Sequence, residues 1–173
     1  MRKELEIKLA EEFAFLRRAE TRQEGRIENL FQAFGYECGD GWYELLRGLC
    51  GQIVSAYEEA GQPVDIVIDQ IKEKFGTLRF YYHFGGQDPG ISAFDFLGLG
   101  SLRISQGDTP LCRKIAEIVA KWEDVSATVC EKCGKPGKLR KDRPWIRTLC
   151  DDCAHVQPIC LAKADSGEGR DGK

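Results

Sequence analysis

The chain has 173 residues, which is enough for one globular core and a small additional module. Hydrophobic residues make up 42% and charged residues 31% of it, as in soluble proteins, and the absence of a long apolar run excludes a membrane-spanning helix. The formal charge of −3 is unevenly distributed: residues 1–129 contain 15 Lys or Arg and 21 Asp or Glu, whereas residues 130–149 contain seven and two. The sequence therefore predicts an acidic body that carries a small basic segment.

The N-terminal part predicts two helices. Residues 3–18 place apolar side chains at helical intervals, and the polar residues 20–29 predict a connector. A longer helix is expected from Trp42 to about Ala60, with Asp40 as its N-cap and Gly61 as its stop. The buried stripe of this helix is expected to comprise Trp42, Leu45, Leu46, Leu49, Ile53, Val54 and Tyr57.

Residues 64–84 predict a β-hairpin, because two runs rich in β-branched and aromatic residues flank a turn that contains Gly76. The aromatic run Phe80–Phe84 places rings on both faces of its strand. One face is expected to pack on helices, and the other needs cover from residues 91–99 or from a partner.

The glycine-rich residues 85–107 predict an irregular excursion with a short strand at 102–104. The sequence Asp108-Thr109-Pro110 then predicts the start of a helix that runs to about Asp124, because proline is favourable in a first helical turn. The last residues lack apolar side chains, so we expect a disordered tail at 159–173.

Four cysteines in two pairs, Cys130-x-x-Cys133 and Cys150-x-x-Cys153, have the spacing of a tetrahedral metal site. Two disulfides or four free thiols are the alternatives. The N-terminal residues contain no apolar stretch that could act as a secretory signal, so we expect a cytoplasmic protein in which thiols stay reduced. Paired CxxC sequences on a hairpin favour one structural Zn²⁺ over an iron–sulfur cluster.

The two pairs differ in their surroundings. Gly134 follows the first pair and suits a turn in which backbone N–H groups point at the thiolates. Asp151 and Asp152 lie within the second pair, which suits the first turn of a helix. A turn, a hairpin and a helix start describe a treble-clef or zinc-ribbon-like module at residues 128–158.

Basic residues with a tryptophan among them lie between and around the cysteine pairs, and they could bind phosphates and stack a base. The residues nominated for such binding are Lys135, Lys138, Arg140, Lys141, Arg143, Trp145 and Arg147, with Lys132 nearby. The alternative is that these side chains offset the thiolates of the metal site, and that Trp145 packs the hairpin against the body. The overall acidity of the chain favours this alternative.

The sequence offers little for catalysis. It contains two histidines, of which His83 is expected to pack at a strand end and His155 to lie on the surface or support the metal site. Four cysteine ligands leave no open coordination position for water. An enzyme of unknown type would have to use carboxylates such as Asp40, Asp65 or Asp69.

The remaining four cysteines have no metal-ligand spacing. Cys50 and Cys112 lie in apolar helical patterns and are expected in the core. The roles of Cys38 and Cys160 stay open, with a redox role as one alternative.

Three stretches together resemble a group of small uncharacterised bacterial and bacteriophage proteins: Gly39-Asp40-Gly41-Trp42, residues 71–81 (IKEKFGTLRFY), and Cys130–Gly137 followed by residues 145–154 (WIRTLCDDCA). The resemblance covers roughly residues 29–156. It implies no activity, but phage and prophage membership implies an accessory role such as binding a host or defence protein.

We therefore expect an α+β body at residues 1–127, with helices packed on a small antiparallel sheet, followed by the zinc module and the tail. The expected function is that of a non-catalytic protein-binding protein with one structural Zn²⁺. Nucleic-acid binding through the basic hairpin is the second hypothesis. The sequence indicates neither the oligomeric state nor the partner.

Overall fold

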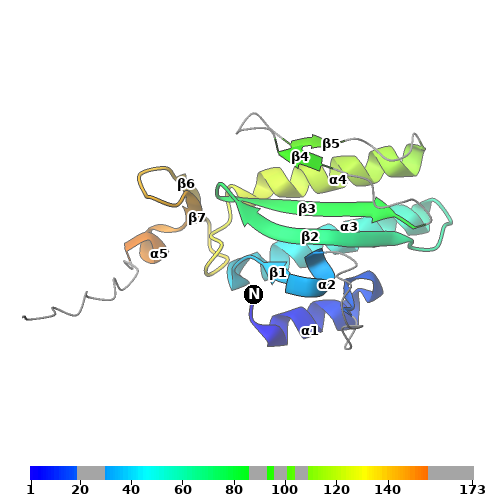
Figure 1. The fold of residues 1–173 in the computed structure, drawn as a ribbon, viewed down its shortest axis with the longest axis horizontal. Coiled ribbons are helices and arrows are strands. Elements are labelled where there is room, and N and C mark those ends of the chain that lie inside the picture. Colours follow the sequence, from blue (N-terminus) through cyan, green and yellow to red (C-terminus); the bar gives the residue numbers. More distant parts are fainter. Residues whose placement is uncertain (19–29, 86–92, 96–100, 104–108, 156–173) are drawn as a thin grey trace, which may run out of the picture.

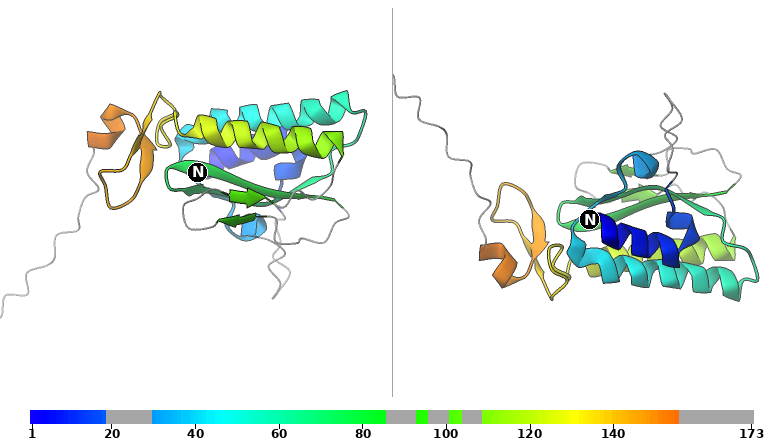
Figure 2. Two further views of the ribbon diagram at one scale, coloured as in Figure 1. Left: turned by 90° about the horizontal axis from the view of Figure 1, so that it is seen from above. Right: turned by 90° about the horizontal axis from the view of Figure 1, so that it is seen from below.

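The computed structural model describes residues 1–18, 30–85, 93–95, 101–103 and 109–155. A small sheet lies between helices, and its order is β1-β2-β3 (Figure 1). The long helices α3 (Tyr43–Glu59) and α4 (Pro110–Ser126) lie side by side on one face of the sheet (Figure 2). Helix α1 (Lys3–Glu12) lies next to α3 on the same side, and the short helix α2 (Leu30–Phe34) lies on the other side of the sheet. The sheet strands are β1 (Tyr36–Glu37), β2 (Ile66–Lys74) and β3 (Thr77–Phe84).

A small C-terminal module extends from the end of the sheet at which β2 turns into β3 (Figure 1). It comprises β6 (Lys138–Arg140), β7 (Arg147–Leu149) and α5 (Asp151–His155). The other elements are the 3₁₀ turns η1 (Ala14–Leu16) and η2 (Asp40–Trp42) and the antiparallel pair β4 (Ala93–Asp95) and β5 (Ser101–Arg103). Among the described residues, no helix has the length and apolarity needed to cross a membrane.

Helix α3 supplies the largest part of the core. The predicted stripe is buried, except that Val54 is only half-buried, and Cys50 is buried with it. Trp42 of this stripe lies in η2, directly before the helix. Burial of the other five large apolar side chains stabilises α3 far more than its intrinsic propensity does, because isolated helices of this length are marginal in water. Gly61 ends the helix with a φ of +63°, as predicted.

The predicted hairpin is confirmed. Strand β2 pairs antiparallel with β3 from Ile66↔Phe84 to Lys74↔Thr77, with a bulge at Asp69. The two-residue turn Phe75-Gly76 has φ values of +53° and +80°. Positive φ at both positions is the geometry of a type I′ turn, which matches the twist of the strands. Phe80 and Phe84 face the helices and are buried, whereas Tyr81 and His83 on the opposite face are half-buried.

Helix α4 covers the free edge of β3. The backbone N–H of Leu78 donates to Ser126 Oγ at 2.8 Å, and that of Phe80 donates to Glu123 Oε1 at 2.8 Å. These side chains replace a neighbouring strand and so protect an edge that could otherwise pair with another chain. The helix starts as predicted, with Thr109 accepting a hydrogen bond from the backbone of Cys112 and with Pro110 in the first turn.

Three expectations about the body need correction. The sheet is mixed, because β1 pairs with β2 in the parallel sense, Tyr36 opposite Ile71. The first helix ends at Glu12, since Phe13 adopts an extended backbone that lets it and Leu16 reach the core. Asp40 does not cap α3: its carboxylate binds the backbone N–H and the guanidinium of Arg2.

Some predicted element bounds and one predicted burial differ slightly from the structure, and other predictions concern residues that the structure does not describe. The predicted strand at 102–104 lies at Ser101–Arg103, and the helix predicted to about Asp124 extends to Ser126. Cys112 is half-buried rather than fully in the core. The connector at 20–29, the tail at 159–173 and Cys160 lie outside the described residues, as do the side chains of residues 91–99.

Candidate metal centre and its junction with the body

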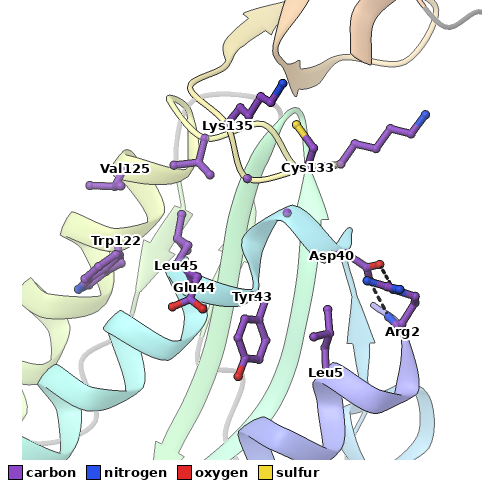
Figure 3. A pocket seen from close by; sticks show the side chains of 14 residues that line it. Arg2, Leu5, Asp40, Tyr43, Glu44, Leu45, Trp122, Val125, Cys133 and Lys135 are labelled. Carbon is purple, nitrogen blue, oxygen red and sulfur yellow. Dashed lines mark hydrogen bonds and ion pairs between the residues drawn. The ribbon is translucent and has the colours of Figure 1, made fainter. Parts of the chain in front are cut away.

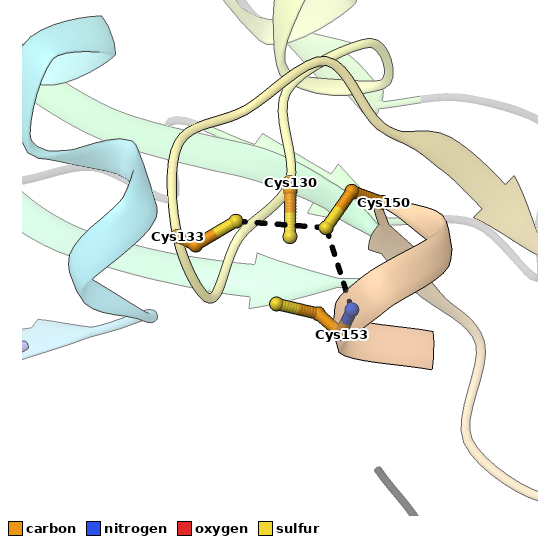
Figure 4. A group of neighbouring side chains, drawn as sticks. All are labelled: Cys130, Cys133, Cys150 and Cys153. Atoms are coloured by element: carbon orange, nitrogen blue, oxygen red, sulfur yellow. Dashed lines mark hydrogen bonds between the residues drawn. The ribbon is translucent and has the colours of Figure 1, made fainter. Parts of the chain in front are cut away.

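The structure brings the four cysteines of the two CxxC pairs together (Figure 4). Their sulfur atoms all lie within 4.8 Å of one another, and the Sγ atoms of Cys133 and Cys150 are 3.6 Å apart. A tetrahedral site with metal–sulfur bonds of about 2.3 Å requires sulfurs about 3.8 Å apart. The cluster can therefore hold a metal ion with little rearrangement.

Different local structures position the two pairs. In the first, the backbone N–H of Gly134 donates to Cys130 O at 2.8 Å, and Gly134 has a φ of +78°. In the second, Cys150 directly precedes α5, and the backbone N–H of Cys153 donates to Cys150 Sγ at 3.4 Å. The CxxCG turn, the β6–β7 hairpin and the helix start form the module that the sequence predicted.

The thiols of the cluster differ in acidity. Burial disfavours the thiolate of Cys130, but backbone N–H groups of Cys150, Cys133 and Lys132 outweigh this effect and lower its pKa to about 7. The pKa of Cys153 is raised to about 12 by burial and by hydrogen bonds with the neighbouring sulfurs. Four adjacent thiolates repel one another, so a bound cation would favour the ionised form of all of them.

A buried glutamate inside the first CxxC pair joins the module to the body. Glu131 is 3% exposed. Its Oε1 accepts the backbone N–H of Gly39 at 2.9 Å, and its Oε2 pairs with the guanidinium of Arg147 at 2.9 Å. A buried carboxylate is costly unless it is paired and hydrogen-bonded, and here both oxygens are. We refer to the contact between residues 39–42 and residues 129–134 as the junction.

Backbone groups complete the junction. The N–H of Gly41 donates to Glu131 O at 2.8 Å, and the indole Nε1 of the fully buried Trp42 donates to Val129 O at 2.9 Å. Side chains would not fit at the two glycines. A Cβ on Gly39 would lie 2.3 Å from Glu131 O, and one on Gly41 would lie 2.2 Å from Cys130 O and 2.4 Å from Gly134 N.

The β2–β3 turn contacts the other side of the module. Thr148 on β7 is fully buried, and its hydroxyl donates to Gly76 O at 2.6 Å. A Cβ on Gly76 would lie 2.2 Å from Leu139 Cδ1. The metal module is therefore attached to the body at two places, through residues 39–42 and through the turn at Phe75-Gly76.

Most of the nominated basic side chains bind groups of their own module. Lys135 pairs with Asp152 at 3.1 Å, Lys138 with Asp151 at 3.4 Å, and Arg140 also with Asp151. Arg143 donates to Ala154 O, and Arg147 binds Glu131. Lys132 and Lys141 form no ion pair within the part of the chain that the structure describes.

The ring of Trp145 does not pack between hairpin and body, because the residue is 68% exposed. Its indole Nε1 nevertheless donates to Glu73 Oε2 on β2 at 3.0 Å. Trp145 therefore contacts the body through its polar atom and leaves its ring in solvent.

A groove of about 690 Å³ lies between the first CxxC turn, η2 and the ends of α1 and α4 (Figure 3). Apolar side chains line much of it, and charged side chains of both signs surround them. The apolar lining consists of Leu5, Tyr43, Leu45, Trp122, Val125 and Val129. The charged residues are Arg2, Asp40, Glu44, Lys132 and Lys135.

The carboxylates considered for catalysis already have partners. Hydrogen bonds from the backbone N–H and the guanidinium of Arg2 lower the pKa of Asp40. Asp65 accepts a hydrogen bond from Tyr57 Oη at 2.6 Å. Asp69 binds His83 Nδ1 at 2.9 Å. The structure does not bring these three into one site. His155 is exposed on α5.

Burial raises the pKa of the Cys38 thiol to about 12, so at neutral pH it is a thiol rather than a reactive thiolate.

Sequence reasoning missed Glu131, Thr148 and the role of the two glycines. A polar residue inside a CxxC pair is ordinary, so only its burial identifies Glu131 as a structural link. The glycines on both sides of Asp40 were a signal, because two glycines so close together indicate that another backbone approaches.

We predict that Gly41→Ala destabilises the protein by about 2 kcal/mol or more, because the added methyl group meets backbone atoms that cannot move independently. Gly51→Ala on α3 is the matched control, since a Cβ there has nothing within 4 Å. It should stabilise the protein by about 0.5–1 kcal/mol, as expected for alanine in a helix interior. Urea unfolding followed by circular dichroism measures both changes, and equal stability of the two variants would contradict the proposed close approach.

Comparison of the chain with protein-family models, with curated proteins and with solved structures found no match. The arrangement of the site is therefore the basis for the functional argument.

Proposed function

We propose that this chain is a non-catalytic, zinc-containing protein that binds another protein. The observation that carries the proposal is the groove beside the first CxxC turn, which apolar side chains of α1, α3 and α4 line next to charged groups. An apolar concavity with a few polar groups at its edge is the usual form of a site for a side chain or short segment of a partner.

Zinc is the metal that the cluster fits best. Four cysteine sulfurs within 4.8 Å of one another suit Zn²⁺, and as four thiolates they would close its coordination sphere. A metal held in this way would order the module and present Glu131 to the body. Its contribution would be folding free energy rather than chemistry.

The charges of the module favour a protein partner over nucleic acid. Residues 130–155 contain seven Lys or Arg and four Asp or Glu, and four thiolates with one Zn²⁺ would add two negative charges. Five of the seven cations already bind groups of the module. A nucleic acid needs several cations that track its phosphates, and the acidic body would oppose its approach.

The resemblance to bacterial and bacteriophage proteins supports an accessory role in which the partner is a host or defence protein. We further propose that the protein acts in the cytoplasm, where reduced thiols stay available to a metal.

Nucleic-acid binding is the second candidate function. The observation that favours it is the exposed ring of Trp145 in the same hairpin loop as Lys141, which has no ion-pair partner among the described residues. One ring and one lysine could stack a base and contact one phosphate.

The metal proposal predicts one Zn²⁺ per chain in protein purified without chelator. Cys130→Ser should abolish this stoichiometry and expose the residues around 128–155 to proteolysis, because the module is too small to fold without the metal. Cys50→Ser is a thiol control outside the cluster, and its zinc content should stay at one equivalent. Elemental analysis that finds less than about half an equivalent in the unmodified protein would contradict the proposal.

The groove proposal predicts that an affinity-tagged full chain co-purifies with a defined protein from its native cells. Lys132→Glu reverses a charge at the groove without breaking an ion pair to a described residue, and it should reduce recovery of the partner. Lys114→Glu, an exposed lysine on α4 outside this groove, is the control. Equal recovery with both variants would show that the groove is not the binding site.

The nucleic-acid alternative is tested by anisotropy titration with duplex DNA, single-stranded DNA and RNA. We expect dissociation constants no better than ~10⁻⁴ M at physiological salt, the range of weak non-specific binding. Micromolar binding that disappears in the Lys132→Glu, Lys141→Glu double variant would make nucleic-acid binding the preferred function. The salt dependence should then have a log–log slope of about −0.9 per phosphate contacted.

A further inference from the structure

One cysteine of the metal cluster is more accessible than the other three. Cys130 and Cys150 are buried and Cys153 is half-buried, whereas Cys133 is exposed. Cys133 also lines the groove beside the first CxxC turn, so a small molecule in the groove can reach it (Figure 3). Because the oxidation of a cysteine depends on access to it, an oxidant would meet the cluster at Cys133 first.

A second sulfur lies in position to complete an oxidation that begins at Cys133. The Sγ atom of Cys150 is 3.6 Å from that of Cys133. A disulfide has an S–S bond of about 2.05 Å, so the two sulfur atoms would have to approach each other by about 1.5 Å. Cys150 belongs to the second CxxC pair, and this disulfide would therefore remove one ligand from each pair.

We propose that the cluster is a reversible redox switch, in which hydrogen peroxide oxidises Cys133 and Cys150 to a disulfide and thereby releases the metal. The sulfur of Cys133 attacks one peroxide oxygen, the O–O bond breaks, and the departing hydroxide takes a proton to become water. The sulfur of Cys150 then attacks the sulfur of the resulting sulfenic acid, the S–O bond breaks, and a second water leaves. Two thiolates lose two electrons, and the peroxide with two protons from solvent becomes two water molecules.

Loss of the metal would act on the junction, because Cys133 lies in the same turn as Glu131. Glu131 accepts the backbone N–H of Gly39 with its carboxylate and that of Gly41 with its carbonyl oxygen. Both contacts need the turn to keep its shape, and a bound metal would supply that order. Oxidation would therefore loosen the junction and change the groove, whose lining includes residues 132–135.

This inference rests on the zinc site of the proposed function and adds its regulation. The test treats the full zinc-loaded chain with hydrogen peroxide. It measures zinc released to a chromogenic chelator, disulfides by peptide mass mapping, and proteolysis around residues 128–155. We expect release of the zinc together with loss of two thiols per chain, a Cys133–Cys150 disulfide and faster proteolysis. Reduction followed by addition of Zn²⁺ should restore both the zinc content and the resistance to protease.

Histidine variants separate zinc binding from oxidation, because histidine can replace a cysteine as a zinc ligand. Cys133→His should keep its zinc and release it about tenfold more slowly under peroxide, since the accessible sulfur is gone. Cys153→His is the matched control. It also exchanges one ligand but keeps Cys133 and Cys150, so its zinc should leave as fast as that of the unmodified chain. The disulfide map of the unmodified chain does not depend on either variant.

Three results would overturn the switch while leaving the zinc site standing. They are zinc that stays bound under peroxide, a disulfide other than Cys133–Cys150, and zinc content that reduction with added Zn²⁺ does not restore. Equal rates of zinc release from Cys133→His and Cys153→His would also overturn it. A chain that never binds zinc would contradict the proposed function itself, so the two failures are distinguishable.

Discussion

The contact between the backbone at Gly39–Trp42 and the first CxxC turn is the constraint on which the rest of the arrangement depends. The two surfaces meet mainly through polar groups. The two backbones meet through N–H and carbonyl groups, a buried carboxylate and one indole nitrogen, at distances that exclude any side chain on the two glycines. Polar contacts of this kind are specific because each buried group must find its partner or lose a hydrogen bond. They fix the orientation of the module rather than merely attach it.

Three stretches that are far apart in the sequence, residues 39–42, 71–81 and 130–154, meet at the two attachment points of the metal module. Gly39–Trp42 contacts the CxxC turn, and the turn at Phe75-Gly76 contacts Leu139 and Thr148. Residues that are far apart in the chain thus serve one architectural purpose. These stretches hold the module in place, and the groove lies beside their contacts.

Much of the fold could be predicted from local sequence. The apolar period of α3, the turn at Gly76 and the spacing of the cysteines each reflect an interaction within a short segment, so the pattern is visible without the rest of the chain. The parallel strand β1 could not be predicted, because a strand of two residues has no period and its partner β2 lies far along the sequence. The same limit applies to the basic segment: Lys138 and Arg140 find Asp151 only when the hairpin closes beside α5. Charge counted along the sequence therefore overstated the cationic surface.

Because the first CxxC turn forms part of the junction, a metal bound by the cysteines would be coupled to the body. Glu131 in the first CxxC turn accepts the backbone N–H of Gly39 in the body. If this turn needs a metal to become ordered, the free energy of metal binding includes part of the folding free energy of the body. Thermodynamic linkage makes this coupling reciprocal. A partner that binds only when the first CxxC turn is ordered would tighten metal binding by the same factor by which the metal tightens partner binding. The cellular concentration of free metal would then set the fraction of chains competent for recognition.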